Sequence, residues 1–504
     1  NVSSGCQTRM PVVPSLNRKA SGRSYSEIVT AIESVLLAIF IPCSGEKLLQ
    51  IKQNTFSMEK SDENELNSRH PELWDEPDFI RHELARTMDH IYSHGMTTTS
   101  GGNMSVADSL GNIWITPSGT DKGALKPDEV VCVAPDGNFE GRLEPSMEYL
   151  LHRAVYDARP DIRALIHAHP PMLTSFSIVH RVPDTSVAGA WRDTCGTAGY
   201  AGYAIPGSEA MAENVASEFR KGHNAVIMEN HAVVTGGRDM AEALARLEAL
   251  ENCALTIHAA GSLGEIRIKE VVQYDAPELP SGPPSANSGL EPEAREGVNE
   301  LSHEEELLAE EISRISFRAC KRGLFYGFCG TISGRSTGDD FLITTERILR
   351  YDLGKAGIAR SGPRGTGTES LLHREIYRRF PYVNAVIGAL PPYLMAFAVT
   401  GKEFDARTIP ESWLMLRELP VVVTGASLPG REEIFEKLNS GSPAVIICND
   451  SVLVTGVSLM QAFDRLEVAE MTAMSLVTAG PLGRIHPIDG EKINDLDKKF
   501  PYKY

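Results

Sequence analysis

The sequence lacks the usual marks of a disulfide-linked or nucleic-acid-binding protein. It has eight cysteines in 504 residues and no Cys-x-x-Cys pair. Scattered cysteines of this kind favour reduced thiols in a cytoplasmic protein over a disulfide framework. Basic residues are outnumbered, with 49 Lys and Arg against 67 Asp and Glu. The net charge of −18 argues against a nucleic-acid partner, because phosphate backbones are bound by clustered Lys and Arg.

A membrane-spanning hydrophobic run is also missing from the N-terminal region. An apolar run at residues 35–41 follows a basic patch at residues 17–19, a pattern that a signal peptide can share. The run is too short to cross a bilayer, and no small-residue cleavage site follows it cleanly. We expect residues 1–75 to be an N-terminal extension, disordered or used for targeting, and we expect no membrane partner.

The length and composition indicate a soluble protein of two or three domains. Apolar residues make up 42% and charged residues 23% of the chain. A stretch rich in Pro, Ser and Gly predicts a linker at 273–300 between domains at 76–272 and 301–490, with a C-terminal tail at 491–504. Short strands alternate with helices, which predicts α/β domains whose helices cover a sheet.

One group of residues in the first domain has the composition of a metal-binding site. His167 and His169 lie two apart on a predicted strand, so their imidazoles point to the same side. Glu148 precedes a helix just upstream, and His231 closes a later apolar run that reads as another strand. Three imidazoles and a carboxylate suit Zn²⁺, although another divalent metal could replace it.

Two loops rich in Gly, Ser and Thr flank the predicted strand at residues 113–116. They lie at residues 99–105 and 117–120. Such loops let the backbone approach an anion closely and offer N–H and hydroxyl donors, but each is also typical of an ordinary turn. His152 has no partner pattern, and we interpret it as a surface or packing residue.

The glutamate, the His-x-His pair, the Asn-His pair and the flanking residues 161–170 and 203–208 resemble the class II aldolase/adducin family, in particular its L-fuculose-phosphate aldolase-like members. The resemblance implies tandem three-layer α/β/α domains, each with a central, mainly antiparallel sheet. It implies a metal bound by His167, His169 and His231, with Glu148 as the acid/base and an occasional ligand. Tyr203 would donate to an aldehyde product.

The resemblance also implies a binding site for the phosphate of the substrate. It assigns this site to Asn103, Ser118, Gly119 and Ser146. Met147 stands where the resembled aldolases often carry a second serine, so the phosphate-binding residues differ in this chain.

The plan of the first domain repeats after the linker, but its chemistry does not. Residues 369–374 echo residues 148–153, and residues 465–467 echo residues 246–248, at offsets of about 220. In the second copy Gly388 and Leu390 match the His-x-His pair, Asp450 matches His231, Thr331 matches Asn103, and Glu346 with Arg347 match Ser118 with Gly119. Glu369 alone survives, so we expect a degenerate second domain without a metal.

The resemblance predicts a class II, zinc-dependent aldehyde-lyase. Its substrate would be a sugar phosphate such as a ketose 1-phosphate, cleaved reversibly into dihydroxyacetone phosphate and an aldehyde. The alternatives are a pentulose-phosphate 4-epimerase, a keto-acid phosphate decarboxylase, a ketose-phosphate dehydratase and a non-catalytic adducin-like scaffold. Epimerases of the family tend to carry Asp where this chain has Glu148. The resembled aldolases form rings, so we expect a homo-oligomer in which two tandem chains imitate a four-domain ring and the second domain walls the first domain's pocket.

Overall fold

The computed structural model describes residues 74–140, 142–267, 301–336, 340–354, 357–361, 368–423 and 432–502. The predicted extension, apart from residues 74–75, and the predicted linker at 273–300 therefore lie outside the described residues. Within the described ranges, no helix combines the length and the apolar character that a membrane crossing requires.

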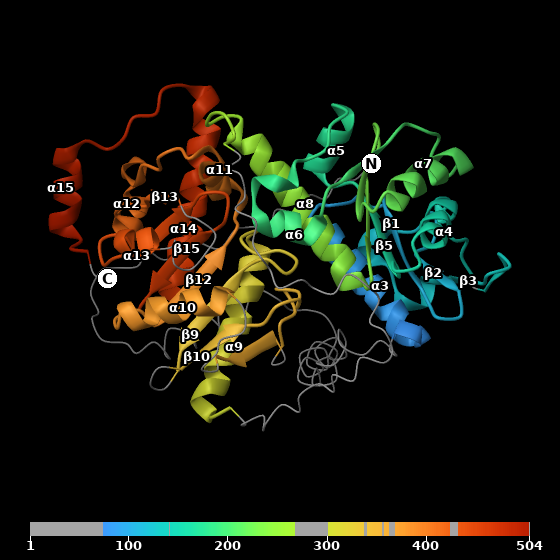
Figure 1. The fold of residues 1–504 in the computed structure, drawn as a ribbon, viewed down its shortest axis with the longest axis horizontal. Coiled ribbons are helices and arrows are strands. Elements are labelled where there is room, and N and C mark those ends of the chain that lie inside the picture. The colour runs from blue at the N-terminus through green and yellow to red at the C-terminus, as the bar shows by residue number, and fades with distance from the viewer. Residues whose placement is uncertain are drawn as a thin grey trace, which may run out of the picture. The chain divides into compact units, whose positions relative to one another are not determined.

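The first repeat alternates short strands with helices, as the sequence predicts (Figure 1). Its elements are α3 (Pro77–Ser93), β1 (Asn103–Ala107), β2 (Ile113–Ile115), β3 (Val131–Val133), β4 (Phe139–Glu140), α4 (Tyr149–Ala158), β5 (Ala164–Ala168), α5 (Pro171–Ile178), the 3₁₀ turn η6 (Thr185–Val187), α6 (Gly189–Cys195), β6 (Gly199–Ala201), α7 (Glu209–Arg220), β7 (Ala225–Met228), β8 (Val233–Gly237) and α8 (Met240–Ala260).

The eight strands form one sheet in the order β4-β3-β2-β1-β5-β8-β7-β6. All neighbours are antiparallel except the parallel pair β6 and β7. Alternate residues of β5 enter different cores: Leu165 packs with α4 and α7, whereas Ile166 packs with α3 and α8. Helices thus cover both faces, which confirms the predicted three-layer α/β/α architecture with a mainly antiparallel sheet.

Helix α3 shows how local pattern and packing agree. Ile80, Leu84, Met88 and Ile91 recur at helical spacing, and all four are fully buried. Each such side chain contributes about 1.5–3 kcal/mol through removal of its apolar surface from water. The helix stops because the chain turns at Gly95, whose φ of 69° lies in the left-handed region that glycine adopts easily.

The second repeat has the same plan, with a seven-stranded sheet in the order β11-β10-β9-β12-β15-β14-β13. Here too one pair, β13 and β14, is parallel and the others are antiparallel. Its elements are α9 (His303–Lys321), β9 (Thr331–Arg335), β10 (Phe341–Thr344), β11 (Ile358–Arg360), α10 (Thr368–Arg379), β12 (Ala385–Ala389), α11 (Pro392–Thr400), α12 (Pro410–Leu416), β13 (Val421–Val422), α13 (Glu432–Lys437), β14 (Ala444–Ile447), β15 (Val452–Gly456), α14 (Leu459–Ala479) and α15 (Gly490–Lys499). The region that the sequence sets apart as a tail, 491–504, thus contains most of α15.

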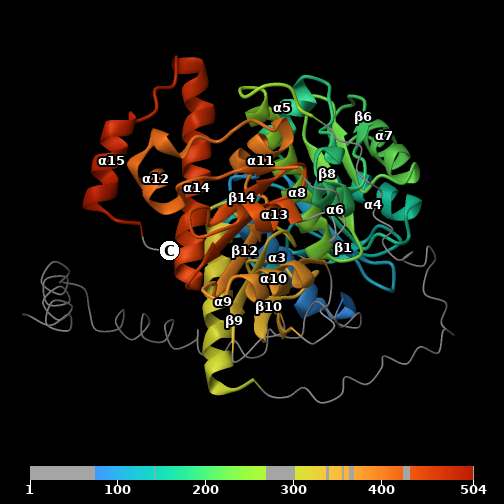
Figure 2. The ribbon, with the colours of Figure 1, turned by 60° about the vertical axis from the view of Figure 1, so that its left-hand side comes forward.

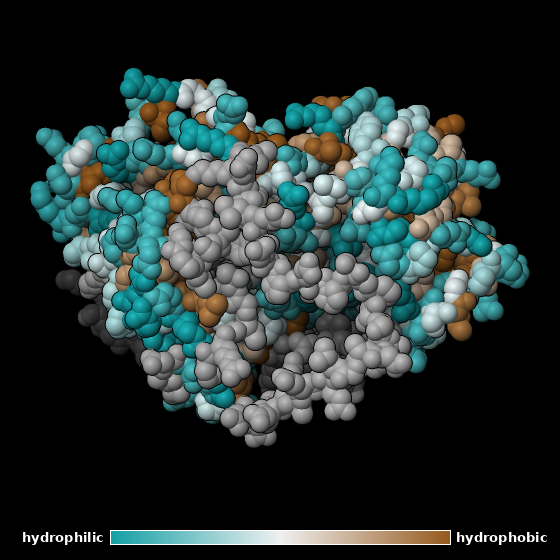
Figure 3. Space-filling model, viewed as in Figure 1, coloured by the Kyte–Doolittle hydropathy of each residue, from teal (hydrophilic) through white to brown (hydrophobic). Residues whose placement is uncertain are grey.

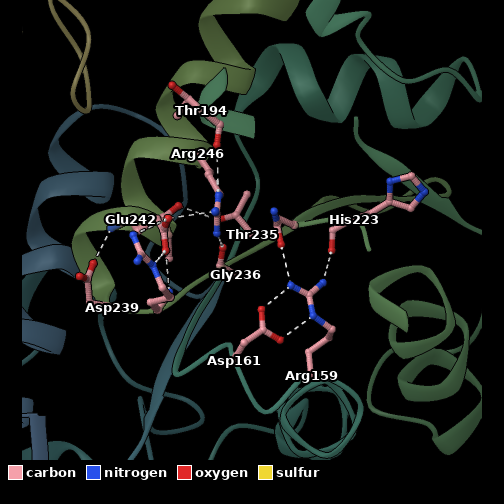
Figure 4. A network of polar contacts seen from close by, with 12 residues as sticks. Arg159, Asp161, Thr194, His223, Thr235, Gly236, Asp239, Glu242 and Arg246 are labelled. Atoms are coloured by element: carbon pink, nitrogen blue, oxygen red, sulfur yellow. Dashed lines mark hydrogen bonds and ion pairs between the residues drawn. The ribbon is translucent and has the colours of Figure 1, made fainter. Parts of the chain in front are cut away.

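An arginine, partly buried in the first repeat and buried in the second, fastens the long helix α8 or α14 to the sheet. The guanidinium of Arg246 on α8 donates to the carbonyl oxygens of Gly236 and Thr194 and pairs with Glu242 (Figure 4). Arg465 on α14 likewise donates to the carbonyl oxygen of Thr455 at 2.7 Å. These charged donors thereby tie α8 to β8 and α14 to β15.

A buried glutamate caps a helix in each repeat in the same way. The Glu251 carboxylate accepts the backbone N–H groups of Met172 and Leu173 at the start of α5, both at 2.9 Å. Glu470 does the same for two N–H groups at the start of α11. The first N–H groups of a helix have no partner within the helix, so both carboxylates stabilise a helix end next to the sheet.

The two repeats pack on each other through one continuous core. The indole N–H of Trp191 on α6 donates to the Tyr326 hydroxyl at 2.6 Å, and both side chains are buried. The Thr256 hydroxyl on α8 donates to the carbonyl oxygen of Pro392 on α11 at 3.1 Å. The Asn449 amide in the β14–β15 turn donates to the carbonyl oxygen of Val187 at 2.9 Å. The second repeat therefore docks with its α11, the loop before β9 and the β14–β15 turn.

Candidate metal centre

Three histidines converge at one edge of the first sheet. His167 lies in β5, and His169 follows directly after the end of that strand. Their Nε2 atoms are 3.2 Å apart, which confirms that both imidazoles point to one side. His231 lies in the turn between β7 and β8, because β7 ends at Met228, three residues earlier than the sequence suggests. The residue before it, Asn230, makes this turn possible with a left-handed φ of 50°.

The three side chains form a group that can hold a metal ion. One ligand atom from each of His167, His169 and His231 lies within 4.8 Å of the others. Among the residues that the structure describes, this is the one such group of His, Cys, Asp or Glu side chains. Three neutral imidazoles are a donor set typical of zinc and related divalent metals.

Hydrogen bonding fixes the orientation of His167. Its Nδ1 lies 3.1 Å from the carbonyl oxygen of Val233, which can only accept, so Nδ1 carries the proton. The other ring nitrogen, Nε2, therefore faces His169 and the Glu148 carboxylate oxygen, which is 3.1 Å away. A cation shared by Nε2 and the carboxylate, either a proton or a divalent metal, stabilises this arrangement.

The ionisation of these groups agrees with a cation site. Burial lowers the pKa of His169 to about 4, with further lowering by the two neighbouring histidines, and burial also lowers the pKa of His231. Burial opposes charge on His167 as well, but the adjacent Glu148 carboxylate outweighs it and raises the pKa of His167. Burial likewise favours a neutral Glu148, yet His167 and Asn103 hold the pKa of that carboxyl below its ordinary value. The carboxylate is therefore ionised.

Glu148 is held from two sides. It is the residue before α4, and its side chain is only 10% exposed. The Asn103 amide donates to its Oε2 at 2.7 Å, and its backbone N–H donates to the Ser146 hydroxyl at 3.3 Å. Its other oxygen, Oε1, lies 3.8 Å from His231 Nε2. The carboxylate thus sits between the histidines and two of the residues predicted to bind phosphate.

A buried chain of hydrogen bonds supports Asn103 from behind. The imidazole of His152 lies between Asn103 Oδ1, 2.5 Å from its Nε2, and the Ser105 hydroxyl, 2.6 Å from its Nδ1. Ser105 in turn contacts the Tyr156 hydroxyl at 2.6 Å. Burial lowers the pKa of His152 to about 3, so the ring is neutral and can donate to Asn103 while accepting from Ser105.

Sequence reasoning missed the role of His152, although two signals could have found it. His152 lies one helical turn after Glu148, and Ser105 lies two residues after Asn103 on the same strand. The second repeat keeps the same arrangement, in which Ser333 contacts both His373 and Tyr377 at 2.7 Å. The network is therefore a feature of the fold, and in the first repeat it leads to the Glu148 carboxylate.

The predicted phosphate residues lie around the same edge. An isolated β-bridge between Pro117 and Pro145 brings the loop of Ser118 and Gly119 beside the loop of Ser146. Ser118 is partly exposed and Gly119 is exposed, with a left-handed φ of 67°. Asn103 differs from them, because its amide is buried and already bonded to Glu148 and His152.

Two neighbours of the predicted phosphate residues also lie at the surface. Met147, which departs from the resembled pattern, is 73% exposed. Tyr203 follows β6, is 62% exposed, and donates its backbone N–H to Glu229 at 3.2 Å. Its ring therefore faces solvent in the single chain.

Two glycines allow the loop before β1 to lie against the histidines. A Cβ on Gly101 would be 2.9 Å from Nδ1 of His169, and one on Gly102 would be 2.8 Å from the carbonyl oxygen of His167. Such contacts are closer than any side chain tolerates against a fixed group, so this loop needs glycine.

Strand pairing shows what replaced the metal site in the second repeat. Asn103 pairs with His167 in the first sheet, and Thr331 pairs with Gly388 at the same place in the second. Arg347 takes the left-handed backbone of Gly119, with a φ of 56°. The side chain of Glu369, the residue that matches Glu148, lies outside the described structure. The fold has been kept while the imidazole ligands are gone.

Comparisons with known proteins agree with this geometry. The profile of the family described as "Class II Aldolase and Adducin N-terminal domain" matches residues 82–258 and 310–477. The chain is 30% identical over 186 residues to the 3-oxo-tetronate 4-phosphate decarboxylase of Escherichia coli K12, covering 36% of this chain and 87% of that protein. It is 32% identical over 165 residues to the L-fuculose phosphate aldolase of Methanococcus maripaludis strain C7, covering 32% and 88%.

A search of solved structures also found similar proteins. A structure of L-fuculose 1-phosphate aldolase aligns with 30% sequence identity and a TM-score of 0.36. The alignment covers 38% of this chain and 90% of that one.

Proposed function

Because the chain belongs to the class II aldolase and adducin family, with one copy of the domain in each repeat, we propose that its first repeat is a metal-dependent aldolase acting on a sugar phosphate. The reaction proposed is reversible cleavage of a ketose 1-phosphate into dihydroxyacetone phosphate and an aldehyde. The observation that carries this proposal is the convergence of His167, His169 and His231 on the ionised carboxylate of Glu148. A domain kept only as a scaffold would have no need to hold these groups together.

The residues present fit a divalent cation, and His167, His169 and His231 would hold it. Zinc is the metal we propose, since the donors are imidazoles. When bound, such a cation supplies Lewis-acid stabilisation of the negative charge that grows on a carbonyl oxygen as a carbon–carbon bond breaks.

Glu148 is the proton carrier in this proposal. A base must take the proton from the substrate hydroxyl, and the carbon released from the broken bond must later gain one. Glu148 is ionised and stands 3.1 Å from His167, so its carboxylate can accept the first proton and return it to carbon. Asn103, held by His152, keeps one carboxylate oxygen in place and leaves the other to move.

The loops of Ser118, Gly119 and Ser146 would hold the substrate phosphate. The net charge of −18 does not oppose this, because a small anion can be bound locally by N–H and hydroxyl groups. Asn103 would bind the phosphate only if its amide no longer donated a hydrogen bond to Glu148. Tyr203 would donate to the aldehyde product, and its exposed ring is accessible for this.

A second candidate reaction comes from one of the relatives. The Escherichia coli protein that is 30% identical is described as a 3-oxo-tetronate 4-phosphate decarboxylase. Loss of CO₂ from a keto acid also builds negative charge next to a carbonyl, so the same ligands and carboxylate would serve. An epimerase is less favoured because of Glu148, and a scaffold is less favoured because the metal ligands are all retained.

The remaining expectations complete the proposal. We propose a cytoplasmic protein that acts as a homo-oligomer, with two tandem chains arranged as a four-domain ring. The second repeat would supply fold and contact surfaces and no metal, because Gly388, Leu390 and Asp450 stand in the ligand positions.

The test begins with metal. Protein purified without added metal should contain about one zinc per chain, and the His167→Ala/His169→Ala variant should contain none. If the wild type contained no metal even after zinc was added, the proposal that this protein is a metal-dependent enzyme would be refuted. Two metals per chain would show that the second repeat also binds a metal ion.

A substrate screen then separates the two reactions. Ketose 1-phosphates should release dihydroxyacetone phosphate in a coupled assay, whereas 3-oxo-tetronate 4-phosphate should release CO₂ if the second candidate is right. Glu148→Gln should abolish turnover in either case with zinc still bound, and Glu209→Gln, at an exposed glutamate on α7, is the matched control.

A further inference from the structure

A lysine is buried beneath the loop at residues 117–120, one of the loops proposed to hold the substrate phosphate. Charged residues normally lie at the surface, and hydrophilic residues cover most of the described part of the face shown in Figure 3. Lys122, at the start of the 3₁₀ turn Lys122–Ala124, is instead only 3% exposed. The loop before it exposes Gly119 and part of Ser118. A buried ammonium group therefore lies next to residues that are open to solvent.

Lys122 joins this loop to the glycine loop at residues 99–102. Its ammonium group donates to the carbonyl oxygen of Pro117 at 2.5 Å, and its backbone N–H donates to the carbonyl oxygen of Thr99 at 2.9 Å. The glycine loop connects α3 to β1, which lie side by side (Figure 2). Gly101 in that loop lies against His169. One residue thus connects the proposed phosphate loop to the loop that packs on the candidate metal ligands.

The ammonium group of Lys122 has few partners. It offers three N–H donors, and the carbonyl oxygen of Pro117 is the one acceptor found for it within the described residues. Burial lowers the pKa of Lys122 to about 8, so the amine still carries its charge at neutral pH. A buried charge without a counter-charge is unfavourable, and an anion bound in the adjacent loop would remove that cost.

The exposed side of the loop has free donors. In the described part of the chain, the backbone N–H groups of Gly119 and Thr120 donate to no protein acceptor. Gly119 has a left-handed φ of 67°, and successive N–H groups around such a residue form a concavity that binds anions. The nearby carboxylate of Asp121 accepts the N–H of Gly123 at 3.0 Å, so it is engaged within the 3₁₀ turn.

Arg350 occupies the position of Lys122 in the second repeat. The offset between them, 228 residues (350 − 122), also relates Thr331 to Asn103 (331 − 103). The backbone N–H of Arg350 donates to the carbonyl oxygen of Gly327 at 2.9 Å, which repeats the backbone bond of Lys122. Both side chains belong to residues that are 3% exposed. The two positions are therefore structurally equivalent.

The guanidinium of Arg350 differs from the ammonium of Lys122 because its donors are used within the protein. It donates to the carbonyl oxygens of Gly330 at 2.5 Å, Thr345 at 2.8 Å and Ile348 at 3.0 Å. The bond to Thr345 matches the bond of Lys122 to Pro117. The other two bonds have no counterpart at Lys122 among the described residues.

The second repeat also carries an internal counter-charge. Glu346 stands at the position of Ser118, and its carboxylate is among the groups that oppose the lowering of the pKa of Arg350 to about 10 by burial. In the first repeat the same place holds an uncharged serine. A counter-charge for Lys122 would therefore come from a bound anion.

We propose that Lys122 is a positioning residue that makes the loop at residues 117–120 specific for a phosphorylated substrate, with its ammonium group as the charge behind the phosphate. The inference rests on the proposed function, because it names the residue that selects a phosphate at the same site. Lys122 takes no part in the proton transfer assigned to Glu148. Its loss should therefore weaken binding of the phosphate end and leave the bond-breaking step in place.

The test is a calorimetric titration of inorganic phosphate into the full-length, zinc-loaded protein. Lys122→Met keeps the length of the side chain and removes its charge, and it should weaken phosphate binding by at least about tenfold. Lys122→Arg copies the second repeat and keeps the charge, so its affinity should stay within about threefold of the wild type. Lys126→Met, at an exposed lysine of the same segment, is the matched control and should bind phosphate like the wild type. Zinc content and melting temperature show that each variant is folded.

Two further measurements separate the loop from the metal and binding from chemistry. The same titrations on the His167→Ala/His169→Ala background, which removes phosphate bound by zinc, should show the same loss with Lys122→Met. On the phosphorylated substrate found in the screen, Lys122→Met should raise KM by at least about tenfold and change kcat by less than about threefold, whereas a purely structural role would lower kcat as well.

Three outcomes would overturn the proposal: no phosphate binding by the wild type, full phosphate affinity in Lys122→Met, or a loss in Lys122→Arg as large as in Lys122→Met. The result is distinguishable from that of the proposed function. A protein that cleaves no ketose phosphate but binds phosphate through Lys122 keeps this site. An active aldolase in which Lys122→Met binds phosphate normally refutes this inference alone.

Discussion

The clearest quantitative prediction concerns Asn103. Replacing Asn103 by Ala removes the amide that donates to Glu148 at 2.7 Å and leaves the buried Nε2–H of His152 without an acceptor. A hydrogen bond to a charged group contributes about 1.5–3 kcal/mol. At about 1.4 kcal/mol for each factor of ten, this corresponds to a loss of roughly 10- to 100-fold in kcat/KM, the range expected when a residue that orients a metal-site group is removed.

The assay is steady-state turnover of zinc-loaded protein on the sugar phosphate found in the screen. Zinc content should stay at one per chain, because His167, His169 and His231 are untouched. The control is Thr331→Ala, at the same strand position in the second repeat, where the hydroxyl is 3.5 Å from His373 and no ligand set is present. It should leave kcat/KM unchanged.

The reasoning about Asn103 fails if its variant turns over like the wild type at full zinc occupancy. It also fails if Thr331→Ala causes the same loss, since the effect would then come from the fold shared by both repeats.

Three further predictions follow from buried groups. Gly101→Ala should weaken zinc binding at least tenfold in a chelator competition, because its Cβ would stand 2.9 Å from Nδ1 of His169. Gly189→Ala is the control, since nothing lies within 4 Å of its Cβ, and equal zinc affinities of the two variants would contradict this prediction. Burial raises the pKa of Glu470 from 4.5 to about 7, so the folded chain keeps a proton that the unfolded chain loses. Stability should therefore fall between about pH 4.5 and 7, by up to about 1.4 kcal/mol per pH unit, and urea midpoints should show that Glu470→Gln lacks this fall. Trp191→Phe should lower the free energy of unfolding by about 1–2 kcal/mol, because it leaves a buried hydroxyl of the second repeat without its donor; an unchanged urea midpoint would refute the contact.

Much of the fold and the candidate metal ligands could be predicted from the sequence. Alternation along a strand places His167 and His169 on one side whatever surrounds them, and helical spacing fixes the buried face of α3. The offset of about 220 residues reveals the second repeat, and reading its ligand positions shows that the imidazoles are lost. These features depend on residues close in sequence or on a repeat of the chain itself, so they need no knowledge of packing.

Packing alone decided how the ligands are supported and how the repeats meet. Asn103 and Glu148 are 45 residues apart, and only the sheet register and the start of α4 bring the amide to the carboxylate. His152 lies on α4 and its partners Asn103 and Ser105 lie on β1, so their contact depends on how the helix packs on the sheet. The same holds for the segments after α8 and α14, in which Leu263 and Ile266 are partly buried whereas the equivalent Leu482 and Ile485 are exposed. Periodicity fixes where a side chain points, but only the tertiary structure fixes what it meets there.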